Sequence, residues 1–205
     1  ELHHKSFFEF FPLSAKQAEE QRNVYFKIRR NFTDCEVFPS LHSPYALTRT
    51  GLDSITDLFN HSEFSSIHYR ESEDELHLDS PDNPMHSFYR NIEPNYKAAF
   101  INPVFSETFG DVLKHTKQLL LVHNTCIRQK DVDDILKWSN RHEVNLNFVL
   151  CPRSNMNINA NLPDIHGLMQ QKLNLCFGTD SLLSAPNLSI FEELKFVQAN
   201  YPEIK

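Results

Sequence analysis

Histidine and carboxylate side chains recur in this sequence at the ends of short apolar runs. The run from Phe64 to Ile67 leads into His68, and Glu71 follows three residues later. On a regular strand, His68 and Glu71 would point to opposite faces of the sheet, because side chains alternate. The two can serve one site only if the strand ends near His68 and the chain then bends back. An imidazole and a carboxylate at one site can bind a divalent metal or transfer protons.

Similar polar residues end the other apolar runs, at His42, His68, His123, Cys151 and Asp180, with intervals of 26, 55, 28 and 29 residues. A single histidine at a strand end is more often structural than functional, but three histidines and an aspartate at successive strand ends are hard to explain as turns. Converging histidine and aspartate side chains suit a borderline ion such as Zn²⁺. The remaining histidines lie in expected helices, in loops or at the terminus, and we expect them to be solvated: His3, His4, His61, His77, His86, His115, His142 and His166. We likewise expect the charged run 128–131 to start a helix on the surface.

The elements that must position these residues alternate between apolar and amphipathic segments. We expect strands at 6–11, 35–41, 64–69, 118–122, 146–150 and 173–177, and helices at 14–30, 50–59, 105–117, 131–141, 162–171 and from 189 onward. This alternation is typical of a parallel sheet with helical crossovers. The repeat length suits an α/β fold of the (β/α)8 TIM-barrel type, which places functional groups at the carboxyl ends of its strands. With about six βα units, residues 1–205 are predicted to form one barrel domain that is incomplete in this chain.

The segment from residue 71 to about residue 104 interrupts the repeat. It begins with a cluster of acidic residues and contains four prolines. A loop of this length in a compact domain is either functional or disordered. We expect an inserted lid-like loop with some helix of its own.

Composition excludes several classes of partner. The 205 residues carry a net charge of −7, with 40% hydrophobic and 23% charged residues, so a nucleic-acid partner is not expected. No apolar run approaches the roughly 20 residues that span a membrane. The four cysteines are scattered singly, which is typical of reduced thiols in an intracellular, cytoplasmic protein.

Five short motifs resemble, in their order, those of the amidohydrolase superfamily. The resemblance is closest to its cytosine deaminase, chlorohydrolase and S-adenosylhomocysteine deaminase branch, and it extends from the third to the eighth barrel strand. The motifs are His42-Ser43-Pro44-Tyr45, Ile67-His68-x-x-Glu71, Leu121-Val122-His123-Asn124, Cys151-Pro152-Arg153-Ser154-Asn155 and Gly178-Thr179-Asp180-Ser181.

The resemblance implies a hydrolase that removes an amino group from a ring by means of metal-activated water. His68 and Asp180 would be ligands of a divalent metal, most readily zinc, with iron as the alternative. Glu71 would carry a proton from the attacking water to the leaving amine, His123 would position that water, and Asp180 would accept the other proton. The substrate would be an amino-substituted heterocycle or nucleoside-like small molecule, contacted by His42. Arg153 and Asn155 match a motif of the family and are further candidates for contacting the substrate.

The metal site of the family also requires an H-x-H pair on the first barrel strand, and this sequence has none, since His3 and His4 are adjacent. The sequence also begins at Glu1, without an initiator methionine. We therefore expect a processed protein or a fragment of a complete hydrolase, which by itself lacks activity and in which the metal can be absent.

Two alternatives remain open. A degenerate barrel could serve as a non-catalytic binding or structural module that retains its strand-end residues, or the chain could belong to another class of TIM-like metal hydrolase. An open six-strand sheet would also have unpaired edge strands, which invite association with another chain. We therefore expect self-association, as a homo-oligomer.

Overall fold

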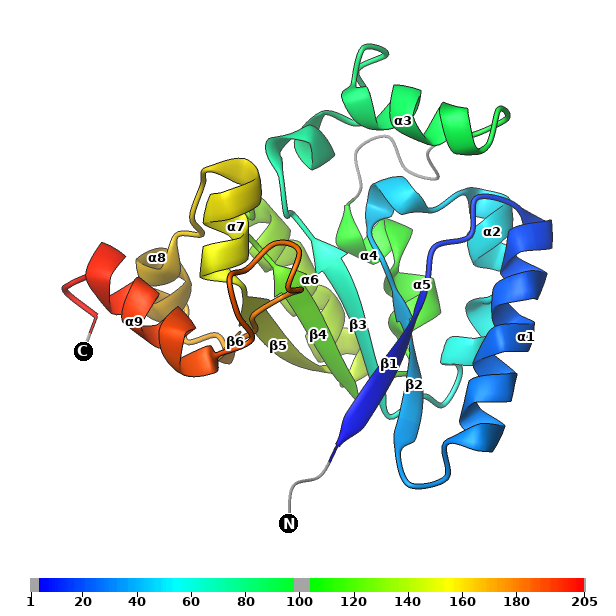
Figure 1. Ribbon diagram of the computed structural model, residues 1–205, viewed down its shortest axis with the longest axis horizontal. Helices are drawn as coiled ribbons and strands as arrows, with labels where there is room; N and C mark the ends of the chain where they lie inside the picture. The colour runs from blue at the N-terminus through cyan, green and yellow to red at the C-terminus, as the bar shows by residue number, and fades with distance from the viewer. Residues whose placement is uncertain (1–3, 98–103, 205) are drawn as a thin grey trace.

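The computed structural model describes residues 4–97 and 104–204, so His3 and residues 98–103 of the expected lid lie outside the described part. Six strands form one parallel sheet in which the order of strands follows the chain (Figure 1). The strands are β1 (Lys5–Phe10), β2 (Glu36–Leu41), β3 (Phe64–Tyr69), β4 (Gln118–His123), β5 (Asn145–Leu150) and β6 (Leu175–Phe177). This arrangement confirms the predicted α/β class and matches part of a TIM barrel.

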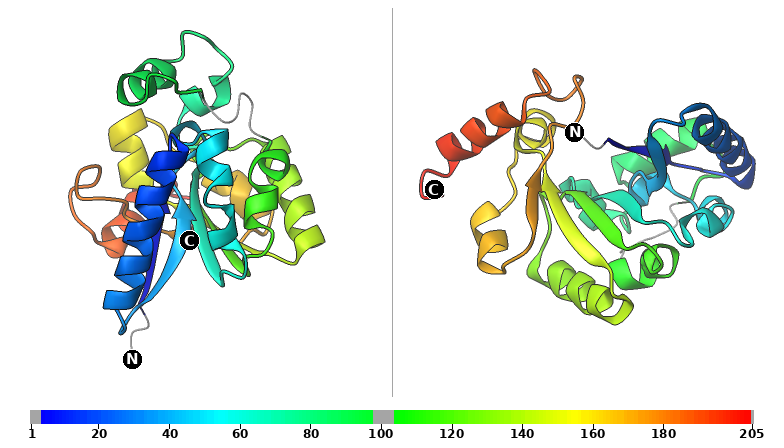
Figure 2. Two further views of the ribbon diagram at one scale, coloured as in Figure 1. Left: turned by 90° about the vertical axis from the view of Figure 1, so that its right-hand side faces the viewer. Right: turned by 90° about the horizontal axis from the view of Figure 1, so that it is seen from below.

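Figure 2 shows the helices of residues 15–31 and 129–142 on the outer side of the arc that the strands form. Helices follow every strand along the chain. They are α1 (Ala15–Asn31), α2 (Arg49–Asp53), α3 (Pro84–Ile92), α4 (Phe105–Thr108), α5 (Gly110–Leu113), α6 (Gln129–His142), α7 (Pro152–Asn159), α8 (Ile165–Gln170) and α9 (Ile190–Asn200), with short 3-10 turns η1 (Pro44–Ala46), η2 (Thr56–Phe59) and η3 (Glu73–His77). Figure 1 shows η3 and α3 above the carboxyl ends of the strands. The lid expected from the sequence therefore contains helix.

One row of apolar side chains fixes the register of the sheet. Adjacent strands pair so that Phe10, Leu41, Ile67, Leu121 and Phe148 are successive partners. All five side chains are fully or almost fully buried in the main hydrophobic core. A slip of one residue would turn this entire row to the opposite face. The core therefore determines which residues of each strand face away from the helices.

The strands at the two ends of the sheet have one partner each among the described residues. β1 pairs with β2, and β6 pairs with β5, so the described strands form an open sheet. No helix in the described ranges is long and apolar enough to cross a membrane.

The helices differ from the sequence prediction at three places, and side-chain hydrogen bonds account for the first of them. The predicted helix at 50–59 breaks between α2 and η2, where Ser54 and Thr56 hydroxyls donate to the carbonyls of Thr50 and Leu52. Such bonds compete with the regular helical ladder. The helix predicted at 105–117 is likewise divided, into α4 and α5, and ends earlier. Helix α7 was not predicted, although Pro152 stands at its first turn, where proline is favourable.

One prediction of solvent exposure is wrong, and a second holds for three of its four residues. His86 is buried, and its Nε2 lies 2.8 Å from the carbonyl oxygen of Leu78 within the expected lid. The charged run 128–131 does start a helix, but Asp131 is buried against Arg70 rather than solvated. In both cases a partner supplies the interaction that makes burial of the polar group favourable, eight residues away for His86 and 61 residues away for Asp131.

Candidate active site at the carboxyl ends of the strands

Three of the predicted site histidines meet at the carboxyl ends of neighbouring strands. His42 follows β2, His68 lies in β3 and His123 ends β4. The ring centroids of His42 and His68 are 4.9 Å apart, and those of His68 and His123 are 4.8 Å apart. The structure therefore brings together side chains from three consecutive strands.

Left-handed backbone conformations occur where the strands end. Arg70, His123 and Asp180 have φ angles of 53°, 76° and 59°, which non-glycine residues seldom adopt. In an unbroken strand, alternation would place His123 on the same face as the buried Leu121. The turn at His123 instead brings its ring beside His68. Strained conformations of this kind are concentrated at functional sites.

The bend at Arg70 allows His68 and Glu71 to share one site. Glu71 Oε1 lies 3.7 Å from His123 Nε2, and the hydroxyl of Tyr45 donates to Glu71 Oε2 over 3.4 Å. One donor atom from each of His68, Glu71 and His123 lies within 4.8 Å of the other two. Strand β3 therefore ends just after His68, and the chain bends back at Arg70, as is needed for His68 and Glu71 to meet.

The carboxylate of Glu75 holds this bend in place. Glu75 is fully buried, and its two oxygens accept hydrogen bonds from the backbone N–H groups of Arg70 (2.8 Å) and Glu71 (2.9 Å). The Asn159 amide donates to the carbonyl of Glu71, and the N–H of Cys126 donates to the carbonyl of Arg70. Burial raises the pKa of Glu75 to about 7, although the two N–H groups act in the opposite direction. The backbone polar groups of the bend are therefore satisfied without water.

We expect Glu75→Gln to destabilise the fold. A carboxamide offers one acceptor oxygen where the carboxylate offers two, so one buried N–H of the bend loses its partner. Such a loss costs about 1–3 kcal/mol. Urea unfolding measures the change, with Asp79→Asn, at an exposed position of the same segment, as the control. Equal unfolding midpoints for Glu75→Gln and the control would show that Glu75 does not hold the bend.

Asp180 follows β6 and is held by two hydroxyl groups. Ser154 and Ser184 each donate to its Oδ2 over 2.5 Å. Partial burial raises the pKa of Asp180, but these hydrogen bonds and the nearby His123 and His68 outweigh it, so the pKa lies below its ordinary value. The groups of three metal donors found among the described residues do not include Asp180.

Asn155 and Arg153, both on α7, have different surroundings. Asn155 is buried, and its Oδ1 lies 3.0 Å from His123 Nδ1, so it orients the ring of His123. The guanidinium of Arg153 donates to Asn187 and lies 3.7 Å from Glu193. Asn155 therefore belongs to the histidine cluster, whereas these contacts of Arg153 point toward α9 and the segment before it.

Glu9 on β1 joins the histidines, although the sequence analysis did not single it out. Its Oε1 lies 3.2 Å from His42 Nδ1 and 3.4 Å from His68 Nε2. Burial raises the pKa of Glu9, but the two histidines outweigh burial and hold the pKa below its ordinary value. Burial, together with His123 and His42, lowers the pKa of His68 to about 4, so its ring is neutral at pH 7. The signal in the sequence is a lone carboxylate within the apolar run 6–11.

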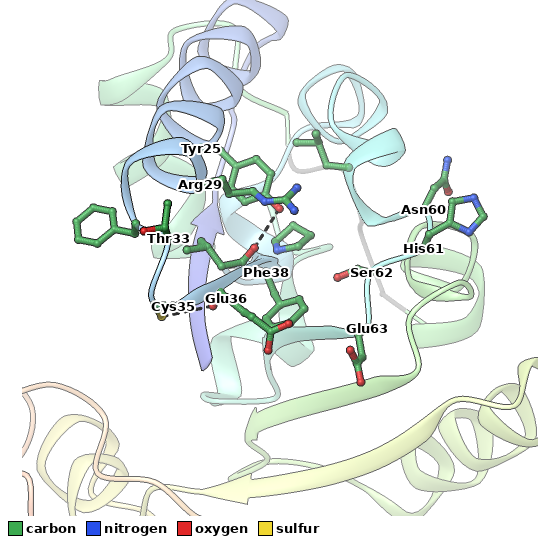
Figure 3. Close-up of a pocket in the computed structure, with 14 residues that line it drawn as sticks. Tyr25, Arg29, Thr33, Cys35, Glu36, Phe38, Asn60, His61, Ser62 and Glu63 are labelled. Atoms are coloured by element: carbon green, nitrogen blue, oxygen red, sulfur yellow. Dashed lines mark hydrogen bonds between the residues drawn. The ribbon is translucent and has the colours of Figure 1, made fainter. Parts of the chain in front are cut away.

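A separate pocket lies at the opposite end of the sheet. It is bounded by the second half of α1, the start of β2 and residues 60–63, and it includes Arg29, Glu36 and His61 (Figure 3). Tyr25 donates to the carbonyl of Val37 at its wall. None of the predicted site residues lines it.

Comparison with known proteins identifies similar sequences. The model of the amidohydrolase family matches residues 82–200, more than half of the chain. A 5-methylthioadenosine/S-adenosylhomocysteine deaminase of Saccharophagus degradans is 32% identical over 74 residues, which cover 36% of this chain and 15% of that protein. A 5'-deoxyadenosine deaminase of Methanothrix thermoacetophila is 37% identical over 62 residues, which cover 30% of this chain and 14% of that protein.

Solved structures with the same fold are longer than this chain. The aminofutalosine deaminase of Helicobacter pylori, in complex with methylthio-coformycin, has a TM-score of 0.79 and 22% identity, and the match covers 95% of this chain but 47% of that one. An adenosine deaminase from Xanthomonas campestris with bound zinc has a TM-score of 0.58 and 15% identity, covering 88% of this chain and 37% of that one. At these identities the likeness is one of fold, and the chain spans about half the length of these neighbours or less.

Proposed function

The chain belongs to the amidohydrolase family, and from this premise we propose that the protein is a hydrolase that releases ammonia from a small, nucleoside-like molecule. One observation carries the proposal. One donor atom from each of His68, Glu71 and His123 lies within 4.8 Å of the other two. The three residues come from β3, the bend after β3, and β4. The names of the matched relatives support deamination of a purine ring, since two of them are deaminases of adenosine derivatives.

The donor chemistry fits a divalent cation in part. Imidazole nitrogen and carboxylate oxygen are ligands that Zn²⁺ and Fe²⁺ accept. We propose that His68 and Asp180 hold such an ion, with zinc preferred. The ion would lower the pKa of a water molecule toward about 7. Because the sequence contains no H-x-H pair, this donor set is partial, and we propose that the chain alone has no deaminase activity.

Proton transfer is assigned to the carboxylates. Glu71 is largely buried, with 14% of its side chain exposed, and the bend holds it beside His123. We propose that Glu71 takes a proton from the attacking water and returns it to the leaving amine, which is general acid–base catalysis. His123, fixed by Asn155, would hold the attacking oxygen in position. Asp180, whose pKa is lowered, would stay ionised and accept the second proton.

Recognition of the ring is assigned to the segment above the strands. We propose that residues 71–104 act as a lid, because Tyr96 donates to the carbonyl of Tyr45 over 2.7 Å and the rings of Tyr45 and Tyr89 lie 5.9 Å apart. Tyr45 also contacts Glu71, so the lid is connected to the catalytic carboxylate. His42 and Asn155 would contact the substrate, and Arg153 would join them if the α9 segment moves.

Ammonia release tests this assignment directly. The protein expressed at the full length of its gene is incubated with 5'-methylthioadenosine, S-adenosylhomocysteine and 5'-deoxyadenosine, and ammonia is measured by a coupled assay. We expect release from at least one of the three. Tight binding of these compounds without ammonia release would favour a non-catalytic binding module, the alternative that the missing H-x-H pair supports.

We also propose that this chain self-associates in a reducing compartment such as the cytoplasm. Within residues 4–97 and 104–204, β1 and β6 each have one strand partner. The segment from β6 to α9 exposes apolar side chains at Leu182, Leu183, Leu188 and Phe191. All four cysteines are free thiols. Light scattering should therefore give a mass above that of one chain, rising with concentration. A constant mass of 24.0 kDa over the whole range would contradict this expectation.

A further inference from the structure

Helix α7, which follows the carboxyl end of β5, is rich in residues that do not favour a helix (Figure 1). Four of its eight residues are serine or asparagine, which have lower helix propensity than alanine or leucine: Ser154, Asn155, Asn157 and Asn159. Each of these side chains forms a hydrogen bond to a residue outside the helix. We propose that α7 is a positioning helix, which fixes the pair of Glu71 and His123 relative to Asp180. The inference rests on the proposed function, because these three residues are assigned to the reaction there.

One row of polar side chains on α7 contacts the pair of Glu71 and His123. Asn155 and Asn159 are four residues apart, so they lie on the same side of the helix. The amide oxygen of Asn155 lies 3.0 Å from His123 Nδ1. The amide group of Asn159 donates to the backbone carbonyl of Glu71 over 3.1 Å. Because Glu71 Oε1 is itself 3.7 Å from His123 Nε2, one turn of helix contacts both members of the pair.

A second row contacts the turn that carries Asp180. Ser154 and Asn157 are three residues apart and lie on another side of the helix. The hydroxyl of Ser154 donates to Asp180 Oδ2 over 2.5 Å. The amide group of Asn157 donates to the carbonyl of Ser184 over 3.1 Å, and the hydroxyl of Ser184 also donates to Asp180 Oδ2. Helix α7 therefore holds Asp180 both directly and through the turn that follows it.

The first turn of α7 is anchored by a buried carboxylate of α9. Glu193 is fully buried, and its Oε2 accepts a hydrogen bond of 3.0 Å from the backbone N–H of Arg153. The guanidinium of Arg153 lies 3.7 Å from Glu193 Oε1. The N–H groups at the start of a helix favour a negative charge there. The helix is therefore fixed at its first turn, independently of its two polar rows.

Steady-state kinetics of the full-length protein test the assignment. Asn159→Ala removes the donor to the bend, and Asn140→Ala, the same change at an exposed position of α6, is the control. Displacement of a reacting group by about 1 Å can cost about 100-fold in rate, so kcat of Asn159→Ala should fall about 10- to 100-fold with little change in KM. Because Asn159 acts through Glu71, adding Asn159→Ala to Glu71→Gln should lower kcat no further. Ser154→Ala should likewise have no further effect when Asp180 is already asparagine.

Hydrogen exchange, measured residue by residue in the same protein, needs no activity. The backbone N–H groups of Arg70 and Glu71 donate to the buried Glu75, so they exchange when the bend opens. Loss of one hydrogen bond to the bend should raise these two exchange rates about 5- to 10-fold in Asn159→Ala. The N–H groups of β4 should keep the rates of the parent protein, and Asn140→Ala should change none of these rates.

Two results would overturn the inference. The first is an Asn159→Ala variant in which the N–H groups of Arg70 and Glu71 exchange as they do in the parent protein. The second is an active parent protein whose kcat is unchanged by Asn159→Ala, or is lowered equally by it with and without Glu71→Gln. A parent protein that releases no ammonia would refute the proposed function, and the exchange rates would still decide whether α7 holds the bend.

Discussion

Replacing Glu71 with glutamine should abolish most of the deaminase activity while leaving substrate binding intact. The carboxamide keeps the shape of the side chain and can still accept from Tyr45, but it cannot take up and return a proton. A positioned general acid–base group contributes about 10²–10⁴-fold to the rate, and kcat should fall by a factor in that range. Because Glu71 acts in proton transfer, KM should change little by comparison.

Steady-state kinetics of the full-length protein, with ammonia release as the readout, measure this effect. Glu73→Gln is the matched control, since it makes the same chemical change two residues away at an exposed position. A Glu71→Gln variant that keeps the kcat of the parent protein would show that the carboxylate does not transfer the proton. The water-activating group would then have to be sought elsewhere in the cluster.

Replacing Arg70 with methionine should have the largest effect on stability. The guanidinium donates to Asp131 over 2.7 Å, and the two side chains are 4% and 6% exposed. Without Arg70, the buried carboxylate of Asp131 keeps only its contact with Arg128, whose Nε lies 3.4 Å away. Breaking a buried ion pair costs about 3–5 kcal/mol, and we expect a loss near the lower end of this range. The loss should be large because Arg70 also forms the bend that carries Glu71.

A double variant separates the ion pair from the bend. Arg70→Met combined with Asp131→Asn also removes the negative charge of the partner. In the parent protein the carboxylate of Asp131 accepts a hydrogen bond from the backbone N–H of Arg128, and the carboxamide oxygen of asparagine can still accept this bond. We expect the double variant to regain part of the lost unfolding free energy in chemical denaturation. An Arg70→Met variant within about 1 kcal/mol of the parent would mean that the pair behaves as an exposed one.

The strand ends could be predicted because parallel sheets are regular. Each βα unit returns the chain to the same edge, so the spacing between His42, His68, His123 and Asp180 was enough to place them there. The pairing of His68 with Glu71 also followed from local geometry, since only a bend lets the two side chains meet. The spacing of residues in the sequence indicates how residues that are close along the chain lie relative to one another.

Contacts between distant residues were out of reach of this reasoning. Nothing in the spacing relates Arg70 to Asp131, which are 61 residues apart. The burial of His86 likewise depends on how the segment folds over Leu78. Glu9 differs from these residues, because it stands among apolar neighbours in a run that predicts a buried strand. Only the pairing with β2 shows that its carboxylate lies on the face opposite Phe10.

The most direct test of the site is to locate a bound ion in a crystal of the full-length protein. Crystals grown with Zn²⁺ would be measured on both sides of the zinc absorption edge. We expect an anomalous peak within bonding distance of His68 and Asp180, with Glu71 and His123 beside it. A protein that deaminates while its zinc lies away from His68 would contradict the assignment of the reaction to these strand ends.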